Sequence, residues 1–317
     1  MKHLYIIGNG FDIFTGLKTS YRDFKVWLKD NYAFVYEALD SVYGENSDEW
    51  WGNFEVSLGK LDITQYVKKF FPPEKPIKQI LEEIEEKRKQ KKNTLNIPPS
   101  FSSESPCAKR LSGLFDILHY CLKKWILSMK SIRDVKYIHL EKDDSLFLSF
   151  NYTRTLEWLY GISKDKILHI HGDAYDDVKL IFGHNSSHVG YNYPNDGDKV
   201  CSVLDRYHKN PYEYIFKHDD FFDKIKDVDF VHIYGLSFSP VDLDYIDCVY
   251  KLVTNANWEI SWYSENDKKR IDSFVLSHWG IKDKLRLIRL DSIVDKIDDK
   301  PTENILIYNG KMKENGI

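Results

Sequence analysis

Polar residues that could do chemistry follow several apolar segments of the chain, at the point where each segment ends. These residues are Gly8-Asn9-Gly10 after 4–7, Asn151 after 146–150, His171 after 167–170, and Ser237 with Ser239 after 230–234. An asparagine amide can orient a water or hydroxyl group, and a neutral imidazole can accept a proton. Gathered in one crevice, these groups would suit a ligand site with a proton transfer.

The apolar segments themselves predict the framework that would gather these groups. Runs at 4–7, 146–150, 167–170, 180–182 and 230–234 are nearly continuous in apolar residues. Such runs indicate strands buried on both faces, as in a largely parallel sheet flanked by helices. In these sheets ligands bind outside the carboxyl ends of the strands. We therefore expect the residues that follow the strands to share one crevice.

The first of these units reads as strand, glycine loop and helix, with helical spacing over 13–28. A helix N-terminus behind a glycine loop suits a phosphate or another anion. The dinucleotide fingerprint would place a third glycine at Ile13, and no acidic residue ends a second strand about 20 residues on. A glycine turn that only joins strand to helix therefore stays open.

Each candidate also has a structural alternative. Asn151 could serve only as a turn or helix-cap residue. His169 and His171, two apart on one strand, would share a face, but no third metal ligand follows at a suggestive spacing. We expect His169 to be a core histidine whose ring nitrogens have hydrogen-bond partners. His171, at the end of the strand and before a glycine, is better placed for proton transfer. The segment 239–242 has the sequence pattern of a helix start, with Ser239 as N-cap. In this interpretation Asp242 has a structural role in the first turn of the helix.

Composition narrows the protein class. Across 317 residues, 42% hydrophobic content suffices for a sizeable core, and a net charge of −4 disfavours general nucleic-acid binding. No span approaches a membrane helix, and the N-terminus lacks the pattern of a signal peptide, so we expect a cytoplasmic protein. The four cysteines lie far apart without CxxC spacing, so no disulfide framework and no metal are expected.

The segment 50–140 is expected to form an inserted helical subdomain, because apolar stripes recur there at helical spacing. Acids precede bases over 82–92, which favours a solvated helix end over an RNA-binding patch. Prolines and serines over 96–106 predict a loop. The flanking parts, 1–49 and 141–317, would form the α/β domain.

These residues carry a resemblance to a known family. The chain resembles the bacteriophage abortive infection AbiH family through motifs that occur in order along nearly its whole length. They are Gly8-Asn9-Gly10-Phe11-Asp12 with Gly16-Leu17-Lys18-Thr19-Ser20-Tyr21, Trp51-Gly52-Asn53-Phe54-Glu55, Phe150-Asn151-Tyr152-Thr153, His169-Ile170-His171-Gly172 and Tyr234-Gly235-Leu236-Ser237-Phe238-Ser239. More remotely, the order of glycine loop, strand-end asparagine, His-Gly and Gly-x-Ser is similar to that of sirtuin-like NAD-binding proteins.

The resemblance implies a sirtuin-like, Rossmann-type α/β fold and hydrolysis of NAD in anti-phage defence. It implies that Asn151 and His171 are the catalytic residues. The residues implied to hold the dinucleotide are Gly8, Asn9, Gly10, Phe11, Asp12, Gly235, Ser237 and Ser239. The first loop departs from the sirtuin pattern, since Asn9 replaces an alanine and no small serine-containing run follows. Asp12 is expected either to contact the ribose or to cap the following helix.

The expected ligand is NAD or a related nucleotide, as substrate or as bound ligand. A phage-derived trigger and a second copy of the chain are further candidate partners, and no membrane is expected as a partner. Two other functions stay open: a nucleotide-binding sensor or interaction module without turnover, and an RNA-degrading nuclease. A nuclease would need a basic groove with clustered acids, and the long basic run lies in the charged segment 82–92.

Overall fold

The computed structural model describes residues 2–44, 47–70, 105–129, 135–188 and 196–294, with the backbone of β7 (Leu306–Tyr308) and β8 (Lys311–Lys313). Its centre is a six-stranded parallel sheet in the order β3-β2-β1-β4-β5-β6. The strands are β1 (His3–Ile7), β2 (Ser145–Ser149), β3 (Ile167–His169), β4 (Phe230–Tyr234), β5 (Asn257–Ser261) and β6 (Leu285–Ile288).

The parallel sheet confirms the α/β expectation from the apolar runs. The strand order reverses between β1 and β4, which is the doubly wound arrangement whose switch point commonly binds ligands. The strand predicted over 180–182 is wrong. There the chain runs without strand pairing, and the Ile181 N–H donates to the His171 carbonyl at 2.8 Å. Close to this segment, His184 and His208 form an isolated parallel β-bridge.

The helix predicted over 13–28 is divided into two. Helix α1 (Asn9–Thr15) ends at Gly16, whose φ of 104° is the left-handed conformation that glycine adopts readily. Helix α2 (Tyr21–Asn31) starts with a capping box in which Ser20 and Asp23 bond reciprocally. The helix-ending glycine and the capping box therefore decide the helix boundaries, although the apolar spacing continues across both.

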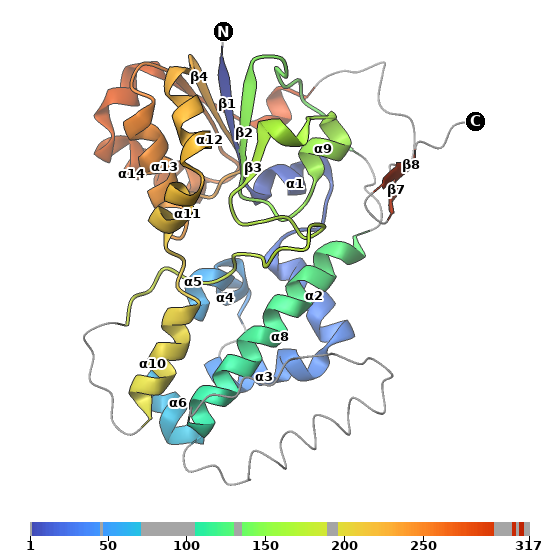
Figure 1. The fold of residues 1–317 in the computed structure, drawn as a ribbon, viewed down its shortest axis with the longest axis vertical. Helices are drawn as coiled ribbons and strands as arrows, with labels where there is room; N and C mark the ends of the chain where they lie inside the picture. The colour runs from blue at the N-terminus through green and yellow to red at the C-terminus, as the bar shows by residue number, and fades with distance from the viewer. Residues whose placement is uncertain are drawn as a thin grey trace.

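Helices cover both faces of the sheet (Figure 1). On one face, Leu4 and Ile6 of β1 belong to a buried core with residues of α12 (Asp219–Lys224), α13 (Leu243–Leu252) and α14 (Glu265–Ser277). On the other, Tyr5 and Ile7 share a core with residues of α1 and of α9 (Thr155–Tyr160). The remaining elements around the sheet are α11 (Pro211–Lys217), η1 (Lys164–Lys166), η2 (Ile225–Asp227), η3 (Trp279–Lys284) and η4 (Leu290–Ser292).

A separate group of helices, called the helical lobe here, lies beyond the carboxyl ends of the strands (Figure 1). Its members are α2, α3 (Ala33–Tyr43), α4 (Asp48–Gly52), α5 (Phe54–Leu58), α6 (Ile63–Phe70), α8 (Pro106–Ser128) and α10 (Gly197–Arg206). One hydrophobic core joins them, from Phe24 of α2 through Phe115 of α8 to Leu204 of α10. The core of this lobe thus also uses helices outside 50–140.

Two sequence predictions fall largely outside the described residues: the charged run 82–92 and most of the loop 96–106. Where the description resumes, Ser105 caps α8 by accepting a hydrogen bond from the Ala108 N–H at 3.1 Å, with Pro106 in the first turn. Among the described residues, no helix has the length and apolarity needed to cross a membrane.

Candidate functional site

The loops after β1 and β4 pack directly against each other at the switch point of the sheet. The N–H groups of Gly8 and Gly10 donate to the carbonyls of Tyr234 (2.9 Å) and Gly235 (2.8 Å). A Cβ on Gly235, whose φ is 67°, would lie 2.0 Å from the backbone nitrogen of Phe11. These glycines therefore have a packing role, and these two N–H groups of the first loop already have acceptors within the chain.

Asn151 lies beside this glycine contact. Ser149 pairs with His169 across β2 and β3, and Asn151 follows two residues later at the strand ends. Its side-chain amide donates to the Gly8 carbonyl at 3.2 Å, and its side chain is buried. The Oδ1 atom has no hydrogen-bond partner among the residues described. Asn151 is not a helix cap, because α9 begins at Thr155.

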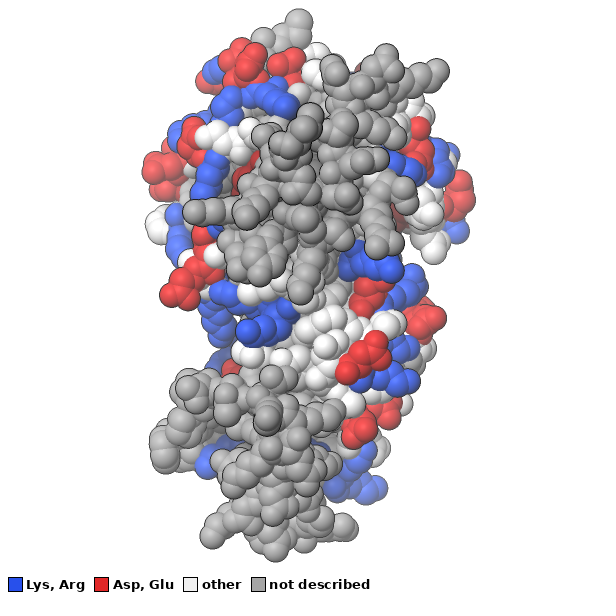
Figure 2. Space-filling view, turned by 90° about the vertical axis from the view of Figure 1, so that its right-hand side faces the viewer, with Lys and Arg blue, Asp and Glu red and all other residues white. Residues whose placement is uncertain are grey.

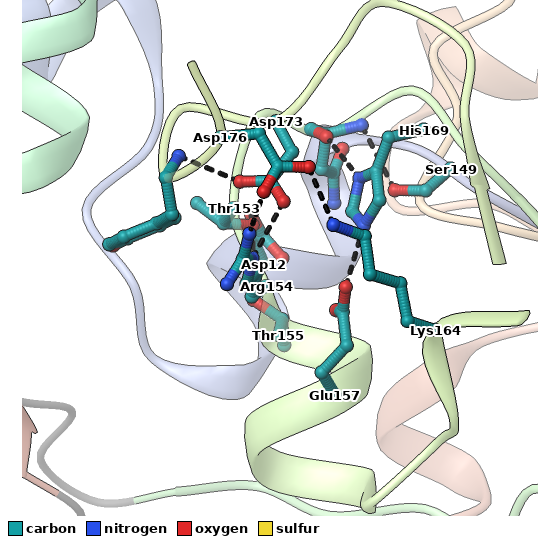
Figure 3. A network of polar contacts seen from close by, with 12 residues as sticks. Asp12, Ser149, Thr153, Arg154, Thr155, Glu157, Lys164, His169, Asp173 and Asp176 are labelled. Carbon is teal, nitrogen blue, oxygen red and sulfur yellow. Dashed lines mark hydrogen bonds and ion pairs between the residues drawn. The ribbon is translucent and has the colours of Figure 1, made fainter. Parts of the chain in front are cut away.

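Asp12 lies in a network of polar contacts near the ends of β2 and β3 (Figure 3). It lies inside α1, where its carboxylate accepts a hydrogen bond from the Thr153 hydroxyl at 2.5 Å, so the capping alternative is wrong. Burial raises the pKa of Asp12 to about 6, while hydrogen bonds with Thr153, Thr155 and Asn151 act in the opposite direction. The pKa of this carboxyl therefore lies closer to neutral pH than that of an exposed aspartate.

His169 belongs to the same network and is a satisfied histidine, as predicted. One ring nitrogen contacts the Asn151 carbonyl at 3.1 Å, and the other contacts Glu157 at 2.9 Å. Burial lowers the pKa of His169, but the Glu157 carboxylate outweighs this effect and the net shift is upward. Nearby, Arg154 bonds Asp173 and Asp176 at 2.6 Å each (Figure 3).

His171 lies apart from this network. Strand β3 ends at His169, so the two histidines do not share a strand face as the sequence predicted. The His171 ring is buried against Phe150, Tyr152 and Tyr245. Its Nε2 atom has no hydrogen-bond partner within the described part of the chain. Burial and the nearby Lys209 charge lower its pKa well below 6.5, so the imidazole is neutral at pH 7.

Asp242 faces His171, with Oδ1 3.8 Å from Nε2. The predicted helix start at Pro240 is wrong: α13 begins at Leu243, and Asp242 closes a turn by donating its N–H to the Ser239 carbonyl at 2.9 Å. Burial raises the pKa of Asp242 to about 7; Lys209 counteracts this shift and Glu55 adds to it. The carboxyl therefore changes charge close to neutral pH, which suits an acid–base group.

A buried ion pair connects this histidine–carboxylate pair to the helical lobe. Lys209 is 2% exposed and lies 2.7 Å from the Glu55 carboxylate of α5. The hydroxyl groups of Tyr21 and Tyr152 donate to the same carboxylate at 2.8 and 3.2 Å. Removing one partner of such a pair would leave a buried charge, and the Tyr152 bond links the Glu55 carboxylate of the lobe to the segment after β2.

The remaining predicted ligand-binding residues differ in position. Asn9 is exposed, and its side-chain amide donates to the Thr19 carbonyl at 2.8 Å. Phe11 is buried against Tyr160 in the core, which gives it a packing role. Ser237 is exposed, and its carbonyl accepts a hydrogen bond from Arg270 at 3.1 Å.

The structure thus brings some of the predicted residues together and not others. Gly8, Gly10 and Gly235 meet one another, and Asn151 with Asp12 lies beside them. His171 instead meets Asp242, which follows Ser239 in the connection after β4. The residue after Ser237 is Phe238, a buried non-glycine residue with a φ of 49°, so this connection is held in a strained conformation.

Sequence reasoning missed Asp242, Lys209 and Glu55 as site residues. Glu55 lies within one of the family motifs, Trp51-Gly52-Asn53-Phe54-Glu55, and that was its available signal. The pattern of a helix start over 239–242 gives Asp242 a structural explanation, and no local pattern singles out Lys209.

One set of possible metal ligands lies in the Asp12 network. Oxygen and nitrogen atoms of Glu157, His169 and Asp173 lie within 4.8 Å of one another. Glu157 already bonds His169, and Asp173 already bonds Arg154. These hydrogen bonds and ion pairs already account for the closeness of the three side chains, so their arrangement does not by itself indicate a metal ion.

Comparison with known proteins identifies one family. The family model described as bacteriophage abortive infection AbiH matches residues 4–262, which is most of the chain and includes every residue of the two clusters above. None of the curated proteins compared with the chain matches it. The extent of the family match shows that the chain belongs to the bacteriophage abortive infection AbiH family.

Proposed function

We propose that this AbiH protein acts in anti-phage abortive infection by hydrolysing the nicotinamide–ribose bond of NAD. Family membership supports the defence role. The doubly wound order of the sheet is compatible with a sirtuin-like fold, because such sheets commonly bind dinucleotides at the switch point.

One observation carries the proposal. Buried polar atoms of both clusters lack hydrogen-bond partners among the described residues: Asn151 Oδ1 and Asp12 Oδ1 beside the glycine loops, and His171 Nε2 with Asp242 Oδ1 in the second cluster. Buried polar atoms in proteins are nearly always hydrogen-bonded, so a group of exceptions calls for a polar ligand. The hydroxyl groups of a ribose and an attacking water would supply the missing partners.

The chemistry needs few protein groups. The bond between the ribose carbon and the nicotinamide nitrogen breaks, and its electron pair leaves with nicotinamide. Water then bonds the electron-poor carbon, and its proton passes to His171 and on to solvent. Burial and Lys209 lower the pKa of His171, so its imidazole is neutral at pH 7 and has a lone pair free to accept the proton. Asn151 orients the water, and ionised Asp242 stabilises the positive charge that develops on the sugar.

The rest of the dinucleotide lies along the loops after β1 and β4 in this proposal. Because the N–H groups of Gly8 and Gly10 bond the neighbouring loop, side chains supply the polar contacts there. Asn9 and Ser237 are exposed, and Ser239 is half-buried, so all three are accessible to a ligand. The glycines set the shape of the loops on which these side chains stand.

The RNA-degrading alternative finds less support. On the face drawn in Figure 2, acidic and basic side chains of the described residues are interspersed. Phosphate backbones are bound by surfaces where basic residues gather, and the whole chain carries a net charge of −4.

The experiment is incubation of the purified protein with NAD, followed by chromatographic separation of the products. Equal amounts of nicotinamide and ADP-ribose support the proposal, provided that Asn151→Ala lowers the yield. An exposed histidine gives a matched control, since His139→Asn should leave the yield unchanged. Binding of NAD without release would favour a sensor, and degradation of added RNA would favour a nuclease; either result without NAD cleavage contradicts the proposal.

A further inference from the structure

We propose that the helical lobe binds one Zn²⁺ ion between His188, Cys201 and Asp205, at a site separate from the His171–Asp242 pair. Cys201 and Asp205 are four residues apart on α10, which places them on one face of the helix. His188 comes from the segment that precedes α10. One ligand-bearing atom from each residue lies within 4.8 Å of the other two.

The distances are close to those of a tetrahedral zinc site. With zinc bonds of about 2.0–2.3 Å, neighbouring ligand atoms lie roughly 3.3–3.7 Å apart. His188 Nδ1 is 3.4 Å from Asp205 Oδ1, and Cys201 Sγ is 3.9 Å from Asp205 Oδ2. These distances run to different oxygens of the Asp205 carboxylate, and the Cys201 thiol also donates to the His188 carbonyl at 3.3 Å, so zinc binding requires the Cys201 and Asp205 side chains to turn toward one point.

The orientation of His188 gives an independent indication of a ligand. Its Nε2 lies 3.1 Å from the Gly59 carbonyl, and because a carbonyl only accepts hydrogen bonds, Nε2 carries the proton. The other ring nitrogen, Nδ1, faces Asp205 and is the atom that can offer a lone pair to a metal ion. Nδ1 is buried without a hydrogen-bond partner in the described residues, and His188 is 8% exposed. A backbone carbonyl that fixes the tautomer in this way is the usual second contact of a metal-bound histidine.

The kinds of ligand favour zinc over harder cations. An imidazole, a thiolate and a carboxylate form a mixed N, S, O set that suits Zn²⁺, whereas Mg²⁺ and Ca²⁺ prefer oxygen atoms. The Asp205 side chain is 37% exposed, so water can provide a fourth ligand. On binding, the Cys201 thiol would lose its proton to solvent. A set with one cysteine does not require the CxxC spacing whose absence suggested that no zinc binds.

An ion here would join parts of the chain that also shape the other site. The segment before His188 pairs with the end of α10: the Tyr207 carbonyl accepts from His184, and Lys209 donates its N–H to the His184 carbonyl at 2.7 Å. Lys209 carries the charge next to Glu55. Zinc would therefore stabilise α10 and the segment 184–188, and Lys209 lies next to both.

The test uses the full-length protein, stripped with a chelator and then dialysed against Zn²⁺ or Co²⁺. We expect one equivalent of zinc to remain bound, and the cobalt form to show thiolate-to-cobalt charge-transfer absorption. Cys201→Ser should lose this absorption and weaken zinc binding at least about 10-fold. Cys248→Ser is the matched control, because Cys248 lies on α13 in a different core, and it should bind like the wild type.

Further measurements keep the test decisive if Cys201→Ser folds poorly. Zn²⁺ should slow the reaction of the Cys201 thiol with a maleimide in the wild-type protein, and Asp205→Asn should remove this protection. Retention of zinc by Cys201→Ser at the wild-type level, or a stripped wild-type protein that binds no zinc, would overturn the proposal. None of these measurements depends on NAD cleavage, so the two proposals can fail separately.

Discussion

His171 Nε2 lies 3.8 Å from Asp242 Oδ1, and neither atom has a hydrogen-bond partner in the part of the chain that the structure describes. His171 follows β3, whereas Asp242 ends the connection from β4 to α13, so the sheet brings them together from distant sequence positions. Burial shifts both residues toward their neutral forms: the histidine pKa falls and the carboxyl pKa rises. The pair therefore combines a neutral proton acceptor with a carboxyl that ionises near pH 7.

The first prediction concerns the proton acceptor. His171→Gln should lower the rate of NAD cleavage by roughly 10²-fold or more, because the amide cannot take the proton from water. Glutamine is close to histidine in size and can hydrogen-bond, so the fold should persist. Kinetic assays together with circular dichroism test this, and an unchanged rate in a folded variant would remove His171 from the mechanism.

The second prediction concerns the charge of Asp242. Because its pKa is raised to about 7, the carboxylate form grows as pH rises through 7, and NAD cleavage should increase over the same range. Asp242→Asn should flatten this pH profile and lower the maximum rate. A profile of the variant that keeps the same inflection near pH 7 would assign that inflection to another group.

The third prediction concerns the effect of the raised Asp242 pKa on the free energy of unfolding. The folded protein binds a proton at Asp242 more readily than the unfolded chain does, so this residue makes folding less favourable as pH rises from about 4 to 7. Asp242→Asn removes the cost of burying the charge. The variant should therefore be more stable than the wild type at pH 8, by roughly 1–3 kcal/mol, with a smaller difference at pH 4. Urea unfolding at the two pH values measures this, and an equal difference at both would contradict it.

The fourth prediction separates packing from ligand binding in the glycine loops. Gly235→Ala should lower the melting temperature strongly, since a Cβ there would lie 2.0 Å from the Phe11 nitrogen and φ is positive. Gly113→Ala is the control: it lies within α8 with nothing within 4 Å of its Cβ, so it should be neutral or slightly stabilising. If both variants melt like the wild type, the close contact of the two loops is wrong.

The sequence predicts the framework better than the site, for physical reasons. Buried parallel strands have a local signal in their apolar runs, and Asn151 and His171 could be located because they follow such runs. The break between α1 and α2 also had local signals in Gly16 and Ser20, but the apolar spacing concealed it. The segment 180–182 is apolar because it packs against the helical core, and apolarity alone does not distinguish this from a strand.

The polar partners of His171 could not be predicted in the same way. Lys209 and Glu55 are 154 positions apart, and their contact exists only once the helical lobe meets the sheet. Asp242 lay in a segment with a convincing helix-start pattern, which gave it a structural explanation. The packing of Gly10 against Gly235 likewise depends on strands β1 and β4 being neighbours, which no local pattern specifies.

The most direct test of the central claim is the NAD content of bacterial cells during phage infection. Cells that produce the wild-type protein should lose most of their NAD after infection and release nicotinamide, whereas cells with Asn151→Ala or His171→Gln at the same protein level should keep it. Infection that aborts in wild-type cells while NAD stays constant would contradict the account.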